Sequence, residues 1–296
     1  MPVIIRRTIM SHETVLKAFR VSCGFLLKQV IVLSLLGGLI GLPLAVALAA
    51  DKAVTTEESA SGPKKNLTVD LGKGVNLEFV LILPGTFMMG AENISDNEKP
   101  VHKVTLTKPF YMTKYEVTQE QWQAVTGENP SQFKETADAP KRPVEQVSWD
   151  DISKKFLPKL AERMPKGLKA RLPTEAEWEY SCRAGTAGDY AGELDAMGWY
   201  EINSKETTHP VGGKKPNAWG LYDMHGNVWE WCADIHGDYS AEAVTDPKGA
   251  ASGSSRIGRG GCWSIGNNHC KSAFRDWGTP GYKSPRLGLR LAVDVP

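Results

Sequence analysis

The residues of this 296-residue chain most able to carry redox, metal or covalent chemistry are its five cysteines. They are Cys23, Cys182, Cys232, Cys262 and Cys270. A pair of thiolates binds soft ions such as Cu(I), whereas cysteines in an oxidising compartment form disulfides. Four cysteines lie in the second half of the chain, and this even number favours disulfides over reactive thiols if the protein is exported.

A second candidate site is the segment DMHGNVWE, which runs from Asp223 to Glu230. It holds two carboxylates seven residues apart on a turn with a glycine, which frees backbone carbonyls. Such oxygens are the hard ligands that Ca²⁺ prefers. The alternative is structural: Asp223 caps the turn and Glu230 pairs with an arginine such as Arg290.

Several other chemistries are disfavoured by the sequence. The histidines show no H-x-x-H or H-E-x-x-H spacing, and no C-x-x-C pair occurs, so zinc is not expected. The chain also lacks the G-x-S-x-G turn of many hydrolases and a phosphate-binding loop. A net charge of +1 does not indicate a nucleic-acid partner.

The compartment is indicated by residues 1–50, where a basic flank precedes a run without charge from Gln29 to Ala50. Small residues at Ala47 and Ala49 provide a signal cleavage site. The run is also long enough to be an uncleaved membrane anchor, although Pro43 weakens a spanning helix. Both readings place the rest of the protein in the periplasm or outside the cell, with membrane contact only through residues 29–50 if the signal is retained.

The exported part divides into a linker and one domain. Residues 51–75 are polar and nearly free of large apolar side chains, which is typical of a linker. Residues 76–296 hold all nine tryptophans and form the predicted domain.

The elements that must position the candidate residues can be predicted from local patterns. Strands are expected in NLEFVLI, VHKVTLT and FYMTKYEVT, the last two paired around Lys108-Pro109. Capping boxes predict three helices, which begin at Thr118, Ser148 and Thr174 and end near Gly127, Met164 and Gly185. From residue 185 onward Gly, Pro, Asn and Asp recur without a helical period. The expected class is therefore a single α+β domain with much irregular loop structure.

Several motifs in this order resemble the formylglycine-generating enzyme, or sulfatase-modifying factor, superfamily. They are LPGTFMMG, PVEQVSWDD, ARLPTEAEWEYSCRAG, WGLYDMHGNVWEWCAD, RGGCW and LGLRLAV. The resemblance implies a C-type-lectin-like fold. It also implies a protein or peptide substrate, which in the family is a sulfatase whose cysteine is oxidised to formylglycine with copper and O₂.

The family's oxidase carries two thiols separated by four residues, shortly after a Gly-Gly-Ser turn. Here the turn is Gly260-Gly261-Cys262, the first thiol position falls on Ile265 and the second on Cys270. The available catalytic pair is then Cys262 and Cys270. If the segment SAFR is matched instead, neither catalytic thiol is present.

By the same resemblance, calcium is held by the side chains of Asp223 and Glu230 and the carbonyls of Gly226 and Val228. The family also carries a disulfide that here matches Cys182–Cys270. Neighbouring strand-like segments suggest a second bridge, Cys232–Cys262.

The family's substrate cleft corresponds here to Trp229, Trp263, Arg275 and Arg286. We expect tryptophans such as Trp229 and Trp231 to belong to the core; the alternative is that Trp263 or Trp277 is exposed in a peptide or sugar groove.

Two functions follow from this reading. The favoured one is a calcium-braced, non-copper or non-catalytic member that binds a peptide, glycan or partner protein in the family cleft, because the C-x4-C pair is absent. The alternative is the copper-dependent formylglycine-generating oxidase itself.

Overall fold

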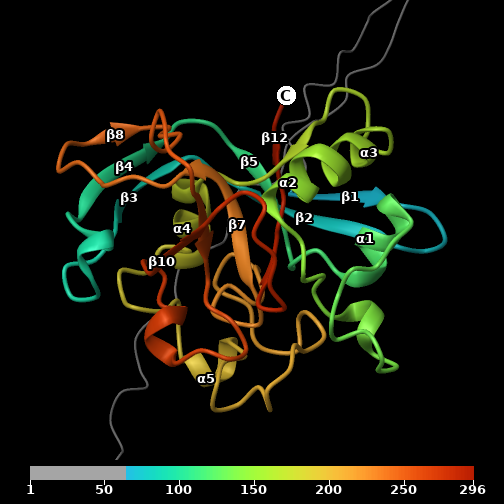
Figure 1. Cartoon of the computed structure of the whole chain (residues 1–296). Coiled ribbons are helices and arrows are strands. Elements are labelled where there is room, and N and C mark those ends of the chain that lie inside the picture. The colour runs from blue at the N-terminus through green and yellow to red at the C-terminus, as the bar shows by residue number, and fades with distance from the viewer. Residues whose placement is uncertain (1–64) are drawn as a thin grey trace, which may run out of the picture. The chain divides into compact units, whose positions relative to one another are not determined.

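The computed structural model describes residues 65–296 (Figure 1). The predicted signal or anchor, Cys23 and residues 51–64 of the predicted linker lie outside the described residues. Within residues 65–296, no helix has the length and apolarity needed to cross a membrane. Mixed helices, three small sheets and long irregular loops agree with the α+β class expected from the sequence.

The largest sheet has five antiparallel strands in the order β1-β2-β5-β12-β6. Their bounds are β1 Asn66–Asp70, β2 Asn76–Ile82, β5 Phe110–Thr113, β12 Ala292–Asp294 and β6 Ala170–Arg171. Alternation places Leu77 and Phe79 of β2 in the core while Asn76 and Glu78 are exposed.

The predicted linker was assigned too far along the chain, because β1 lies inside it. Val69 of β1 is buried, and the strand pairs with β2 in register from Asn66 to Asp70. The turn that joins them uses positive φ at Gly72, Lys73 and Gly74. The apolar residues of β1 alternate with polar ones, so the segment has the polar composition of a linker although it forms a half-buried strand.

A three-stranded sheet, β3-β4-β8, contains β3 Gly85–Met89, β4 His102–Leu106 and β8 Val244–Thr245. The predicted pairing of β4 with β5 is wrong. Strand β4 pairs with β3 across the loop of residues 90–101, which includes the short helix η1 Asp96–Glu98, whereas β5 joins the larger sheet. In Figure 1 β3, β4 and β8 lie on the left and β1 and β2 on the right, with β7 between.

The third sheet has the order β10-β9-β7-β11 and carries most of the candidate site. Its strands are β10 Arg275–Gly278, β9 Arg256–Arg259, β7 Trp229–Ile235 and β11 Leu287–Gly288. Alternation along β7 places Trp229 and Trp231 in one apolar cluster and Cys232 in the other.

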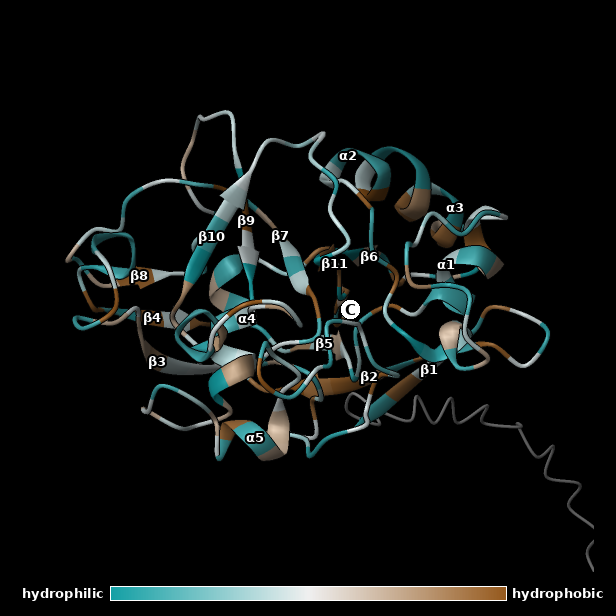
Figure 2. Cartoon of the chain, turned by 60° about the horizontal axis from the view of Figure 1, so that its bottom comes forward, coloured by the Kyte–Doolittle hydropathy of each residue, from teal (hydrophilic) through white to brown (hydrophobic). Residues whose placement is uncertain are grey.

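Capping boxes begin helices at the three predicted places, α1 Gln119–Thr126, α2 Trp149–Asp151 and α4 Glu175–Arg183. Helix α1 ends at Gly127 as expected. Helix α2 continues through a π-helical turn, η3 Ile152–Phe156, into α3 Leu157–Ala161, and so ends three residues before Met164. In Figure 2 α3 carries both apolar and polar residues, because only one side of it packs on the core.

The remaining helical segments are short. They are η2 Ala139–Lys141, α5 Leu194–Met197 and η4 Asn267–Cys270. Helix α4 ends with left-handed residues at its C-cap Ala184 and at Gly185, which occupies the predicted C′ position.

Candidate functional site

A cleft of about 130 Å³ opens where β7, β10 and β11 meet the following loops. Trp229 and Trp231 of β7 form its floor, and Ile265, Trp277, Tyr282 and Arg286 line its sides. Trp277 and Tyr282 are 43% and 53% exposed, so large apolar surface remains in contact with solvent here. This exposed aromatic surface makes the cleft a candidate binding site.

Three of the four predicted cleft residues gather at this place. Trp229 and Arg286 line the cleft, and the Arg286 guanidinium lies 5.9 Å from the ring centroid of Trp263. Trp263 is oriented by a hydrogen bond from its Nε1 to the Pro285 carbonyl, at 3.0 Å. Trp277 is exposed, which agrees with the alternative of an exposed groove tryptophan, whereas the sequence analysis did not identify Tyr282.

The assignment of Arg275 to the cleft is wrong. Its side chain is buried and donates from Nε to Glu175 Oε1 at 2.7 Å and from Nη2 to Glu175 Oε2 at 3.0 Å. Arg275 is held toward α4 by these bonds to Glu175, whereas the next two residues of β10, Asp276 and Trp277, line the cleft.

Neither predicted disulfide is present, since Cys182, Cys232, Cys262 and Cys270 are all buried free thiols. The Cys232–Cys262 bridge fails because the two residues lie in different apolar clusters. Cys232 points to the α4 side of β7, whereas Cys262 packs with Trp229 and Trp231. The sequence showed only that the two cysteines lie in neighbouring strand-like segments, and it did not show that their side chains point to opposite faces.

Cys182 and Cys270 are not bonded either, although each lies beside His225. The Cys182 thiol donates to the Met224 carbonyl at 3.6 Å and lies 3.7 Å from His225 Nε2. His225 Nδ1 is 2.9 Å from the Cys270 carbonyl, while its Nε2 accepts from the Ala191 N–H at 3.1 Å. These contacts fix the ring as a neutral tautomer, and burial lowers the pKa of His225 to about 4.

The thiols are also poor ligands and nucleophiles. Burial raises the pKa of Cys182 to about 12, and it raises the pKa values of Cys262 and Cys270 as well. Neither Cys262 nor Cys270 lines the cleft, and Ile265, at the first thiol position, presents a hydrocarbon side chain to it. The residues of this cleft therefore do not fit the copper site expected for the family oxidase, which needs two accessible thiolates.

The turn RGGC itself is tightly packed against Cys270. Gly261 has a φ of 78°, and a Cβ added there would lie 2.5 Å from Cys270 Sγ. The second glycine is required both for the left-handed backbone and for this close approach.

At the predicted calcium segment, Glu230 is already compensated by a guanidinium. Arg290 donates from Nε to Glu230 Oε2 at 2.6 Å and from Nη2 to Oε1 at 2.7 Å. Trp178 Nε1 adds a third bond to Oε2, at 2.5 Å. Glu230 is therefore paired with Arg290, which is the structural alternative to a calcium ligand that the sequence offered.

Asp223 is less well satisfied. Its Oδ2 accepts from the Gly212 N–H at 2.7 Å, but its buried Oδ1 has no partner. Buried Glu116 interacts electrostatically with Asp223 and Glu230, and burial raises the pKa of Glu116 well above its usual range and that of Asp223 to about 6. Glu116 itself accepts from the Val228 N–H at 3.0 Å and from Asn227 Nδ2 at 2.6 Å, so Asp223 Oδ1 is left as the buried carboxylate oxygen without a partner here.

A cation here would depend on main-chain oxygens. In residues 65–296, no three side chains of His, Cys, Asp or Glu are grouped so that they could hold a metal ion by themselves. The Gly226 and Val228 carbonyls would have to complete the coordination of Asp223 and Glu230.

Comparison with known proteins decides the family. A family model described as a sulfatase-modifying factor enzyme 1-like domain matches residues 69–295. The chain belongs to the sulfatase-modifying factor family.

Relatives in this family differ in what their names say. The formylglycine-generating enzyme of Streptomyces coelicolor is 37% identical over an alignment of 178 positions, and the match covers 53% of this chain and 54% of that protein. This chain thus aligns with about half of that enzyme. The chaperone protein LppX of Paenibacillus barcinonensis is 31% identical over 269 residues, covering 73% of this chain and 89% of that protein.

Among solved structures, Treponema denticola variable protein 1 superposes with a TM-score of 0.73 at 31% identity. The match covers 79% of this chain and 100% of that one. Proteins that are similar to this chain in sequence or structure therefore carry different names.

Proposed function

We propose that this sulfatase-modifying factor domain is a binding module that holds a peptide or a segment of a partner protein in the cleft, without copper chemistry. The observation that carries the proposal is the cleft wall: Ile265 occupies the first thiol position, and four of the other ten lining residues are aromatic. Rigid aromatic side chains give a large contact area at little cost in conformational entropy. The name of the LppX relative, a chaperone protein, also supports a protein partner.

Arg286 favours an acidic residue in the bound segment. It is exposed and lies over Trp263, and no carboxylate of the described residues forms an ion pair with it. A carboxylate bound there gains charge-assisted hydrogen bonds while its apolar neighbours pack on Trp277 and Tyr282. A glycan, which could stack on the same rings, is the second candidate ligand.

The experiment is isothermal titration of the purified chain with two blocked peptides, acetyl-Leu-Glu-Leu-amide and acetyl-Leu-Lys-Leu-amide. We expect the Glu peptide to bind more tightly, and Arg286→Gln to weaken it roughly three- to tenfold. The exposed Lys283→Gln serves as the matched control and should leave the affinity unchanged. Equal affinity for the two peptides, or no effect of Arg286→Gln, contradicts this assignment.

The copper oxidase remains the alternative because relatives are named formylglycine-generating enzymes. We expect the chain with Cu(I), O₂ and a Cys-x-Pro-x-Arg peptide to give no formylglycine above a control without protein. Cys262→Ser should not change this result, because the position of Ile265 still lacks a thiol. Aldehyde formation that depends on Cys270, detected by mass spectrometry, would establish the oxidase instead.

Calcium and export belong to the same proposal. The unpartnered Asp223 Oδ1 supports a Ca²⁺ ion held with Glu230 and the carbonyls of Gly226 and Val228, where it would brace the loop below the cleft.

The uncharged run of residues 29–50 supports a periplasmic or extracellular location. A chain that begins at Asp51 should then stay in the cytoplasm, and its recovery outside the cell would contradict the export signal.

A further inference from the structure

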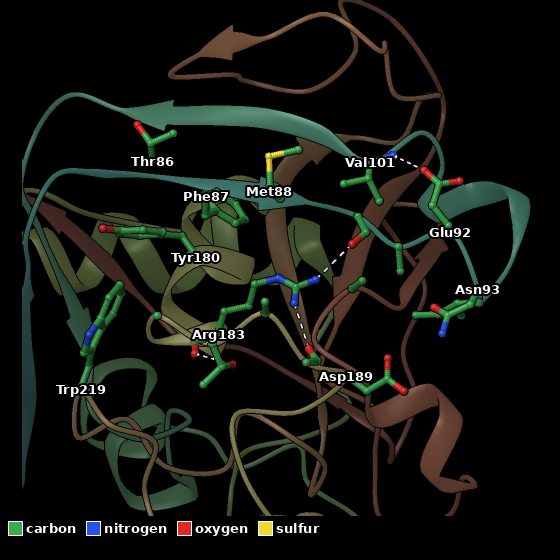
Figure 3. A pocket seen from close by; sticks show the side chains of 18 residues that line it. Thr86, Phe87, Met88, Glu92, Asn93, Val101, Tyr180, Arg183, Asp189 and Trp219 are labelled. Carbon is green, nitrogen blue, oxygen red and sulfur yellow. Dashed lines mark hydrogen bonds between the residues drawn. The ribbon is translucent and has the colours of Figure 1, made fainter.

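A second, larger pocket of about 560 Å³ lies between β3 and the loop that follows α4 (Figure 3). Its walls come from β3, residues 90–94, the C-terminal half of α4 and residues 185–189. It shares no lining residue with the aromatic cleft. Pockets that bind small ligands have volumes of roughly 300–1,000 Å³, so this pocket is large enough for a small ligand or for one or two side chains of a peptide.

One end of this pocket is aromatic. Tyr180 lies between Phe87 and Trp219, with ring centroids 5.3 Å and 4.8 Å away. The Tyr180 hydroxyl donates to the Leu83 carbonyl at 3.3 Å, which holds the ring in place. Met88 is 54% exposed and extends the apolar surface. The faces of these rings carry negative electrostatic potential, which attracts cations.

The other end is acidic, and Figure 3 shows Glu92 and Asp189 on the side away from Trp219. Glu92 Oε1 accepts the Val101 N–H at 3.0 Å, and no Lys, Arg or His of the described residues forms an ion pair with this carboxylate. Asp189 lies 3.2 Å from Lys271 Nζ and remains 42% exposed.

The one cation in the wall, Arg183, is already neutralised. Its Nε donates to Glu179 Oε1 at 2.9 Å, its Nη1 donates to the Gly188 carbonyl at 3.0 Å, and its Nη2 donates to the Gly90 carbonyl at 3.1 Å. Arg183 therefore closes the pocket without offering a free positive charge to an anion. Since Asp189 is paired with Lys271, the lining carboxylate without an ion pair is Glu92, whose charge also acts on Lys99.

We propose that this pocket binds an organic cation in which an ammonium or guanidinium group is attached to an aromatic or large apolar body. The cationic group lies at Glu92, with Asp189 nearby, and the apolar body packs on Phe87, Tyr180 and Trp219. Two sources share this chemistry, a basic side chain beside an aromatic one in a polypeptide and a free aromatic amine. No sulfur, metal or covalent step is involved.

The test is isothermal titration of the full chain with acetyl-Phe-Lys-amide and with phenethylamine, each against its charge-reversed partner, acetyl-Phe-Glu-amide and hydrocinnamate. We expect the cations to bind at least threefold more tightly than the anions, and the difference to shrink as salt is raised. Binding of the peptide alone assigns a polypeptide, and binding of the amine alone assigns a free amine. Equal binding of cations and anions, or no binding of either cation, overturns the proposal.

Variants locate the site on the molecule. Glu92→Gln keeps an acceptor for Val101 but removes the charge, and it should weaken cation binding roughly three- to tenfold. Trp219→Phe, which is milder to the fold than an alanine, should weaken it further, whereas Trp277→Ala in the aromatic cleft should not. Full affinity in Glu92→Gln, or loss of affinity in Trp277→Ala, overturns the assignment to this pocket.

Discussion

At the scale of single residues, buried carboxylates are the groups whose state responds most to solution conditions. Asp234 accepts the Glu175 N–H at the start of α4 with its Oδ2, at 2.9 Å. Burial and the nearby charge of Glu175 raise the pKa of Asp234 to about 7. The folded protein therefore binds a proton that the unfolded chain releases near pH 4.

This shift predicts a pH dependence of stability with a definite sign. The contribution of Asp234 is present in full below the unfolded pKa and is lost as pH rises through about 7. Between pH 5 and pH 8 the unfolding free energy of the wild type should fall, and in Asp234→Asn this fall should be smaller by about 1–3 kcal/mol. Urea titrations of both proteins at the two pH values measure the difference, and an identical pH dependence would rule out Asp234 as its source.

The partly unsatisfied Asp223 predicts a response to calcium. A site present only in the folded state stabilises it by about 2.7 kcal/mol at a hundredfold excess of ligand over Kd. Chelation should therefore lower the Tm of the wild type but not that of Asp223→Ala, measured by differential scanning fluorimetry. A shift of the same size in both proteins would leave Asp223 without a role in metal binding.

At the scale of elements, α4 connects the pocket of about 560 Å³, the buried thiols and the third sheet. The Thr174 hydroxyl accepts the Glu177 N–H at 3.1 Å, and Glu177 Oε2 accepts the Thr174 N–H at 2.8 Å. This capping box fixes where the helix starts and therefore where Trp178, Tyr180 and Cys182 point.

Removal of this cap should destabilise the domain measurably. Thr174→Ala should lower the unfolding free energy by about 1 kcal/mol, since the Glu177 N–H then loses its acceptor. Thr174→Ser keeps the hydroxyl and is the matched control, with a change of a few tenths of a kcal/mol. Chemical denaturation followed by tryptophan fluorescence measures both, and equal losses would mean that the cap bond contributes little.

At the scale of the whole molecule, a buried ionic network joins α4 to strands β9 and β10 and to the loop after β3. Glu179 forms a buried ion pair with Arg259 and a second, at 2.8 Å, with Arg183, and it also accepts the Gly90 N–H at 3.0 Å. Loss of one charge in such a network leaves uncompensated buried cations.

Glu179→Gln should therefore cost about 3–5 kcal/mol of unfolding free energy. The matched control is Glu128→Gln, whose partner Lys155 forms an exposed ion pair at 2.6 Å and whose loss should have no measurable effect. Thermal and urea unfolding of both variants measure the contrast. Similar stabilities of the two variants would show that the network is not needed to hold these elements together.

The family, the fold class and the three capped helix starts followed from the sequence by itself. Capping boxes act over three residues and family motifs keep their order along the chain, so neither needs knowledge of long-range contacts. The tertiary structure decided the rest: that Arg275 turns inward to Glu175, that Cys232 and Cys262 face different clusters, and that Glu230 meets Arg290. Each depends on which face of a strand meets an element 30 to 100 residues away in the chain, and local patterns carry no information about that partner.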